Sequence, residues 1–126
     1  MTHTEQDKVA QEVVRCAREV YIILGYGFPE VVYRRALSAE MILRNVDHQR
    51  DVRVPLFYKC IDVGQRHVDF LVEKEMPVKV TAFVNLADTH IAQAIKYLEA
   101  CDLETGLLIN FGADILQFKR LFNEKY

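Results

Sequence analysis

The stretch Leu107-Leu108-Ile109-Asn110-Phe111 is the feature that most limits how this chain can fold. It is apolar at every position but one and does not alternate with polar residues, which is the pattern of a short strand buried on both faces of a sheet. A sheet with such a strand needs covering layers above and below it. The run therefore predicts a sheet with helices on both sides, as in an α/β sandwich.

The remaining hydrophobic pattern changes from a helical period to an alternating one and back. Gly25 supplies a stop after the first helical stretch. We expect helices over Val9–Leu24, Pro29–Asn45 and Thr89–Cys101, with Asp88 as the N-cap of the last. Gly64 is expected to end the second strand. The expected strands are Arg53–Tyr58, Cys60–Val63, Val68–Val72, Val78–Ala82, Leu107–Phe111 and Ile115–Phe122. Two helices, four strands, a helix and two strands predict one α/β domain over residues 1–126, with a mixed sheet flanked by helices.

Composition limits the class of protein further. The chain has 126 residues and a net charge of −2, which is the balance of a single globular domain and not of a strongly basic nucleic-acid-binding module. Cys16, Cys60 and Cys101 are odd in number and far apart, so we expect neither a disulfide framework nor a zinc site. Met1–Gln11 is polar, and no apolar run reaches membrane-spanning length. We expect a cytoplasmic protein with no membrane partner.

Residues Gly27 to Tyr33 form a Gly-x-x-Glu-x-x-Tyr motif. Pro29 suits the first position of a helix, where its missing N–H would have no partner anyway. Glu30 then lies in the first turn, and Tyr33 and Leu37 follow on the same face. The motif places a carboxylate at a helix start above an apolar stripe that can pack on the sheet. Glu30 could also serve only the helix dipole, and Tyr33 is expected in the core.

Three further blocks follow in the chain. They are Arg66–Val72, which contains Asp69; the pair Gln93-x-x-x-Tyr97, preceded by His90; and the segment Gly106-Leu-Leu-Ile-Asn-Phe-Gly112. Together with the first motif they resemble the GxxExxY family, a branch of the PD-(D/E)XK nuclease-like superfamily, over nearly the whole chain from Val9. The resemblance implies a core of helix, three-strand meander, helix and strand. It also implies phosphodiester hydrolysis that depends on a divalent metal ion.

One block departs from the family pattern. The family carries Glu-x-Lys on the strand after the aspartate, whereas this chain has Lys79-Val80-Thr81. The resemblance implies metal ligands at Glu30 and Asp69, and a catalytic pocket made of Glu30, Asp69, Lys79, Thr81, Gln93 and Tyr97. Strand alternation puts Asp69 on a face matching that of Lys79 and Thr81, so we expect an ion pair between Lys79 and Asp69. Losing a carboxylate and gaining an ammonium both oppose magnesium binding.

We therefore expect a catalytically inactive nuclease-fold protein that needs no cofactor and acts by binding nucleic acid or a protein partner. A second possibility is a nuclease dependent on magnesium or manganese with a rearranged site, in which Glu73 or Glu75 replaces the missing carboxylate. A third is a homodimer formed through the exposed hairpin or the last strand. A local basic group around the second helix is either a solvated face or a phosphate-contacting surface; its members are Arg34, Arg35, Arg44, Arg50 and Arg53.

Overall fold

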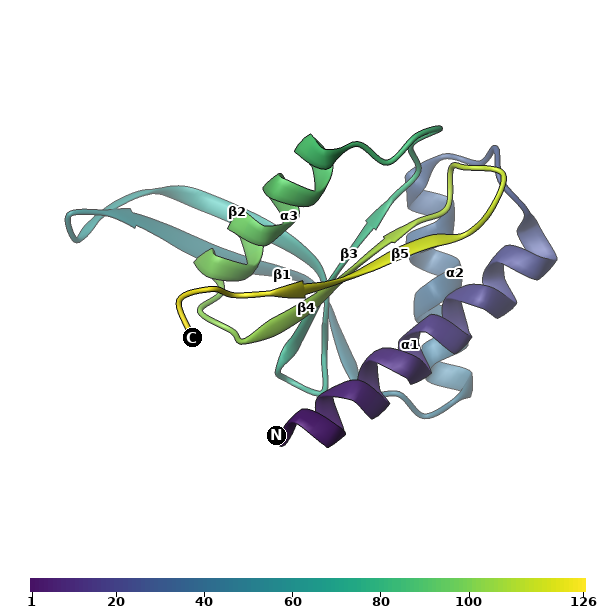
Figure 1. Ribbon diagram of the computed structural model, residues 1–126, viewed down its shortest axis with the longest axis horizontal. Helices are drawn as coiled ribbons and strands as arrows, with labels where there is room; N and C mark the ends of the chain where they lie inside the picture. The colour runs from purple at the N-terminus through teal and green to yellow at the C-terminus, as the bar shows by residue number, and fades with distance from the viewer.

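The computed structural model, which describes residues 1–126, contains three helices and five strands (Figure 1). Along the chain they are α1 (His3–Leu24), α2 (Glu30–Leu43), β1 (His48–Tyr58), β2 (Ile61–Val72), β3 (Met76–Thr81), α3 (Asp88–Ala100), β4 (Thr105–Asn110) and β5 (Gln117–Phe122). The predicted α/β class is confirmed, and the helices and strands follow in the expected order. None of the three helices combines the length and the hydrophobicity needed to cross a bilayer.

The five strands form one mixed sheet in the order β1-β2-β3-β4-β5. All neighbours are antiparallel except β3 and β4, which run parallel and are joined by the crossover helix α3. All six residues of β4 are buried, as the apolar run in the sequence predicts. Gly112 follows β4 at a point where a Cβ atom would lie 2.3 Å from the carbonyl carbon of Ala82, so the chain passes there only with glycine.

Helices cover the sheet on both faces, with α1 and α2 on one side and α3 on the other (Figure 1). The larger core lies under α1 and α2, where Val13, Leu37 and Met41 pack with Phe70 and Ile109. The smaller core lies under α3 and joins Ala94 and Leu98 to Leu108 and Leu121. The sheet therefore has an apolar layer on each side, which explains why β4 shows no alternation.

Two predicted strands, Cys60–Val63 and Val68–Val72, are in fact one continuous strand, β2. Gly64 was expected to end the first of them, but it lies inside β2 with φ of 140°. The register with β1 shifts between Leu56 and Phe57, so that Val63 has no partner and the strand continues through a β-bulge. The glycine permits the bulge and does not stop the strand.

Other boundaries differ by a few residues. Helix α1 begins at His3 because Thr2 caps it by accepting a hydrogen bond from the Glu5 N–H at 3.2 Å. The N-cap of α3 is Ala87 and not Asp88, which lies in the first turn. The residues His48–Val52 belong to β1 because β2 pairs with them on both sides of Asp51.

Tyr33 ties the α1–α2 connection to the sheet. Its side chain is fully buried, and its ring stacks on Phe111 with centroids 4.7 Å apart. Its hydroxyl donates to the Gly25 carbonyl at 2.7 Å and accepts from the Phe28 N–H at 3.2 Å. The tyrosine of the Gly27–Tyr33 motif is therefore a core residue, as expected, and it holds the turn that starts α2.

Replacing Tyr33 with phenylalanine keeps the stacked ring and removes only the hydroxyl. Because the Gly25 carbonyl and the Phe28 N–H then lose their partner, we expect Tyr33→Phe to lower the free energy of unfolding by about 1–2 kcal/mol. Urea denaturation followed by circular dichroism measures this. Tyr58→Phe is the control, since Tyr58 is 61% exposed and its change should stay within about 0.5 kcal/mol. Equal effects of the two substitutions would contradict the assigned role.

Candidate functional site

The site begins where β2 and β3 separate. Their backbone pairing runs from Val72 opposite Met76 to Phe70 opposite Val78 and stops there. Beyond that point the Asp69 carboxylate replaces a backbone partner, because its Oδ2 accepts a hydrogen bond from the Val80 N–H at 2.8 Å. From there β2 continues with β1 alone as a two-stranded arm that projects from the body (Figure 1).

Lys79 lies across this gap from Asp69. Its Nζ is 3.6 Å from Asp69 Oδ2, which confirms the ion pair expected from the sequence. The Asp69 side chain is only 10% exposed and that of Lys79 31%, so the pair is shielded from water on one side. The carboxylate therefore already has a backbone N–H and an ammonium as partners.

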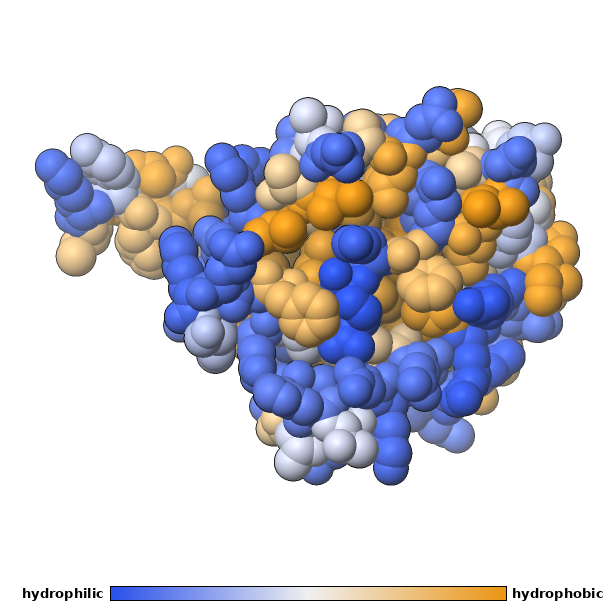
Figure 2. Space-filling model, viewed as in Figure 1, coloured by the Kyte–Doolittle hydropathy of each residue, from blue (hydrophilic) through white to orange (hydrophobic).

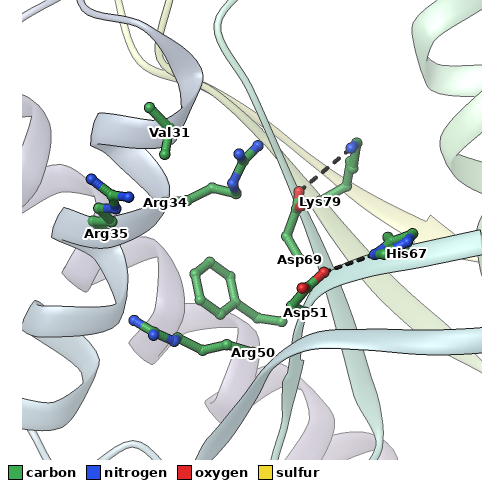
Figure 3. A pocket seen from close by; sticks show the side chains of 9 residues that line it. Val31, Arg34, Arg35, Arg50, Asp51, His67, Asp69 and Lys79 are labelled. Atoms are coloured by element: carbon green, nitrogen blue, oxygen red, sulfur yellow. Dashed lines mark hydrogen bonds and ion pairs between the residues drawn. The ribbon is translucent and has the colours of Figure 1, made fainter.

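A pocket of about 510 Å³ opens beside this pair, between α2 and the base of the β1–β2 arm (Figure 3). Four cationic side chains and two carboxylates line it, in a chain whose net charge is negative. The lining residues are Val31, Arg34, Arg35, Arg50, Asp51, His67, Asp69, Phe70 and Lys79. The pocket thus has a local excess of positive charge.

Helix α2 supplies one wall of the pocket. Arg34 projects from it toward Asp69 (Figure 3) and forms an ion pair with Glu30, one helical turn earlier. Glu30 itself does not line the pocket. The carboxylate at the helix start therefore orients an arginine and does not converge with Asp69, in contrast to the arrangement expected from the family motif.

The opposite wall carries a second carboxylate. Asp51 has a left-handed φ of 54° on β1, and its Oδ1 lies 2.8 Å from Nδ1 of His67 on β2. The hydrogen bond from His67 lowers the pKa of Asp51 from its ordinary value, and the positive charges of Arg53 and Arg34 act in the same direction. Asp51 is therefore ionised and held by His67.

Thr81 does not reach the pocket. It is buried at the end of β3, where its hydroxyl contacts the Ile109 carbonyl at 3.2 Å and Asn110 Oδ1 at 3.1 Å. The expectation that Thr81 shares the pocket with Lys79 was wrong, because β4 runs beside β3 here and takes the hydroxyl as a hydrogen-bond partner. A lysine at this position would have to bury its ammonium next to β4.

Gln93 and Tyr97 line a separate groove, between α3 and the arm, together with Leu56, Arg66 and Lys96. Tyr97 lies between the groove and the ion pair. The Arg66 guanidinium is 5.0 Å from its ring centroid and donates to its hydroxyl at 3.3 Å, and Lys79 Nζ is 5.8 Å from the same centroid. Tyr97 therefore contacts Lys79, whereas Gln93 belongs to the neighbouring groove.

His90, which precedes these residues in the sequence, has a structural role. Its Nδ1 accepts a hydrogen bond from the Ala87 N–H at 3.0 Å, and its ring stacks on Phe83 with centroids 3.7 Å apart. These contacts close the first turn of α3. His90 therefore lines neither the pocket beside α2 nor the groove beside α3.

The basic group around α2 divides in two. Arg34, Arg35 and Arg50 line the pocket, whereas Arg44 pairs with Glu40 at 2.6 Å and Arg53 lies outside. Sequence reasoning missed the Asp51–His67 pair. The only available signal was the polar stretch from residue 47 to residue 51, which is equally typical of a loop.

Comparison with known proteins identifies the class. The model of the PD-(D/E)XK nuclease superfamily matches residues 7–121, so the chain belongs to this superfamily. The solved structure titled "Crystal structure of SSO0001" is similar with a TM-score of 0.56 and 13% sequence identity; the match covers 95% of this chain and 59% of that protein. At this identity the likeness shows the fold alone, and this chain spans less than two thirds of that protein's length. No curated protein matches this chain in sequence.

The residues of the pocket do not fit the divalent metal that the superfamily implies. No group of three or more histidine, cysteine, aspartate or glutamate side chains converges anywhere in the structure. Asp69 is paired with Lys79, and Asp51 with His67. Glu73 and Glu75, considered above as replacements, lie in another depression with Met1 and Glu5. An ammonium beside the one central carboxylate is the opposite of the donor set that magnesium prefers.

The Lys79–Asp69 pair can be tested by a double-mutant cycle. Lys79→Met leaves a largely buried carboxylate without its cation, so we expect a loss of about 1–2 kcal/mol in the free energy of unfolding. Asp69→Asn keeps an acceptor for the Val80 N–H. If the ion pair is real, the two losses should be non-additive by about 1 kcal/mol in urea denaturation. Strictly additive losses would show that the two side chains do not interact.

Proposed function

We propose that this protein is a nuclease-fold protein of the GxxExxY kind that binds nucleic acid through phosphate contacts and does not cleave it. The observation that carries the proposal is the Lys79 ammonium, 3.6 Å from Asp69 Oδ2, on the strand where the family motif carries a glutamate. A fixed ammonium there supplies positive charge without a metal ion. The pocket then offers a phosphate group several cations and no metal-binding set.

The charges around the pair support phosphate as the ligand. Arg35 and Arg50 line the pocket without a carboxylate partner within ion-pair distance. Arg34 forms an ion pair with Glu30, and no other cation contacts that carboxylate. Guanidinium groups bind phosphate oxygens in pairs of hydrogen bonds, and they keep their charge at any physiological pH. Unpaired arginines in a concave site are therefore available to an anionic ligand.

The same residues explain why binding would not lead to hydrolysis. Metal-dependent phosphodiester cleavage needs an ion held by carboxylates to activate a water molecule and to stabilise the leaving oxygen. Here the central carboxylate accepts the Val80 N–H and faces an ammonium. Neither Asp69 nor the His67-bound Asp51 belongs to a group of three side chains that could hold a metal ion. The pocket would hold a phosphate, and it lacks the set of carboxylates that would hold an ion to activate the attacking water.

Anisotropy of a fluorescein-labelled oligonucleotide of about 20 nucleotides tests this proposal for single-stranded DNA, duplex DNA and RNA. We expect binding that is the same in EDTA and in magnesium or manganese, with intact oligonucleotide on a denaturing gel. For about three phosphate contacts to a single strand, the slope of log K against log salt should be about −2.

The variant Arg35→Gln/Arg50→Gln should weaken binding by about tenfold and make the salt slope shallower, since each lost contact removes about 0.7 from its magnitude. Lys8→Gln is a control for the loss of one positive charge, because Lys8 lies outside the pocket. Metal-dependent cleavage by the wild type would overturn the proposal in favour of a nuclease with a rearranged site. Absence of any binding would overturn it in favour of a protein partner.

A further inference from the structure

The two edges of the sheet are built differently. The β1 edge carries three features that oppose pairing with another strand: Pro55 has no N–H to donate, Asp51 has a left-handed φ of 54°, and a bulge lies at Leu56/Phe57. The β5 edge carries none of them. Its register with β4 is unbroken from Gln117 to Phe122, and no residue in it has a positive φ. Only β5 is therefore a regular, open edge.

The hydrogen-bonding groups at this edge have a definite pattern. The Asn123 N–H donates to the Glu104 carbonyl at 2.9 Å, just beyond the pair Phe122 and Thr105. Because antiparallel ladders alternate, the backbone groups of Leu121 and Lys119 point to β4. Those of Phe118, Arg120 and Phe122 consequently point away from the sheet, and they are free for a sixth strand.

The side chains of these three residues share one face, beside α1. Arg18 lies 5.4 Å from the Phe118 ring centroid, and Arg120 lies 5.4 Å from that of Phe122. Phe118 is 42% exposed and Phe122 60%. Figure 2, in the same view as Figure 1, shows hydrophobic atoms exposed over β5 with hydrophilic atoms between them. The open edge is thus flanked by two partly exposed aromatic rings.

We propose that a second copy of this chain pairs with β5 in antiparallel fashion about a two-fold axis through Arg120, giving a continuous ten-stranded sheet. This register brings the outward backbone groups of Phe118 opposite those of the partner's Phe122, and the reverse. Each of these pairs exchanges two hydrogen bonds, as does the central pair. The same register places each Phe118 ring beside a partner's Phe122 ring, and cross-strand aromatic pairs stabilise sheets. The edge is therefore complementary to itself.

Charge is compatible with this register. The two Arg120 side chains meet at the axis, but each is already compensated by Asp7, whose Oδ1 lies 2.9 Å from its guanidinium. A further hydrogen bond of 3.1 Å to Thr105 Oγ1 holds Arg120 over β4 of its own subunit. Lys119 falls opposite the partner's Leu121 and not opposite another lysine. A register shifted by one residue would put Lys119 opposite Arg120 and would mismatch the backbone groups.

Sedimentation velocity and cysteine cross-linking test the proposal on the full chain. We expect a dimer that dissociates on dilution, and Phe118→Pro should shift it to monomer, because proline removes an N–H that points only to the partner. Phe118→Val is the matched control; it keeps that N–H and replaces the ring with another residue that favours strands, so it should weaken the dimer without abolishing it. Circular dichroism checks that both variants fold. A wild type that stays monomeric at about 1 mM would overturn the proposal.

Cross-linking tests the register independently of affinity. In a background of Cys60→Ser and Cys101→Ser, only the buried Cys16 remains, and burial raises its pKa to about 11. Phe118→Cys mixed with Phe122→Cys should form disulfide-linked dimers on mild oxidation, since facing residues in a hydrogen-bonded pair have Cα atoms about 5.5 Å apart. Neither variant alone should cross-link. Cross-linking of Phe118→Cys with itself, or no cross-linking in the mixture, would overturn the register.

Discussion

The hydrogen bond from the Val80 N–H to Asp69 Oδ2 marks the place on which the rest of the site depends. Backbone pairing of β2 and β3 ends at Phe70 opposite Val78, so this carboxylate satisfies a backbone group, the Val80 N–H, that would otherwise face a gap in the sheet. The separation of the strands frees β2 to continue with β1 as a projecting arm. It also opens the space between α2 and the arm in which the arginines gather.

A carboxylate in this position needs a cation, because it is nearly buried. In the superfamily a divalent metal ion is the expected cation. In this chain the Lys79 ammonium lies there and interacts with Asp69 across the strands. Exchanging a removable ion for a side-chain ammonium keeps a cation beside this carboxylate. Under the proposed function, Arg35 and Arg50 would then bind phosphate. The departure at residues 79–81 is therefore compatible with the fold of the superfamily, because Asp69 still has a cation beside it.

Much of the fold could be predicted from the sequence because its signals are local and strong. The apolar run of β4 and the helical period of α1 and α3 specify their elements directly, and Tyr33 follows from its place on the helix face. The bulge at Gly64 could not be predicted, since a glycine between apolar stretches also ends strands. Its role depends on β1 pairing along the whole length of β2.

The site was predicted only in part, for a related reason. The pairing of Asp69 with Lys79 follows from alternation on adjacent strands, because both residues lie directly next to the last ladder pair, Phe70 and Val78. Thr81 lies beyond the point where β2 leaves β3, so it turns to Asn110 on β4 instead. Glu30 forms an ion pair with Arg34 on its own helix and does not turn toward Asp69. Which of the two partners Glu30 contacts depends on tertiary distances that no spacing in the sequence encodes.

The backbone amide of Val80 offers the most direct measurement of the central claim, because it donates to the Asp69 carboxylate. Its resonance in a proton–nitrogen correlation spectrum reports on whatever cation or anion approaches the pair. We expect an oligonucleotide to shift the Val80 and Lys79 amide signals to the same end point in EDTA and in magnesium, and we expect trace manganese to leave both signals sharp. Selective broadening of the Val80 signal by manganese, relieved by magnesium, would show a divalent ion at Asp69 and would contradict metal-independent binding.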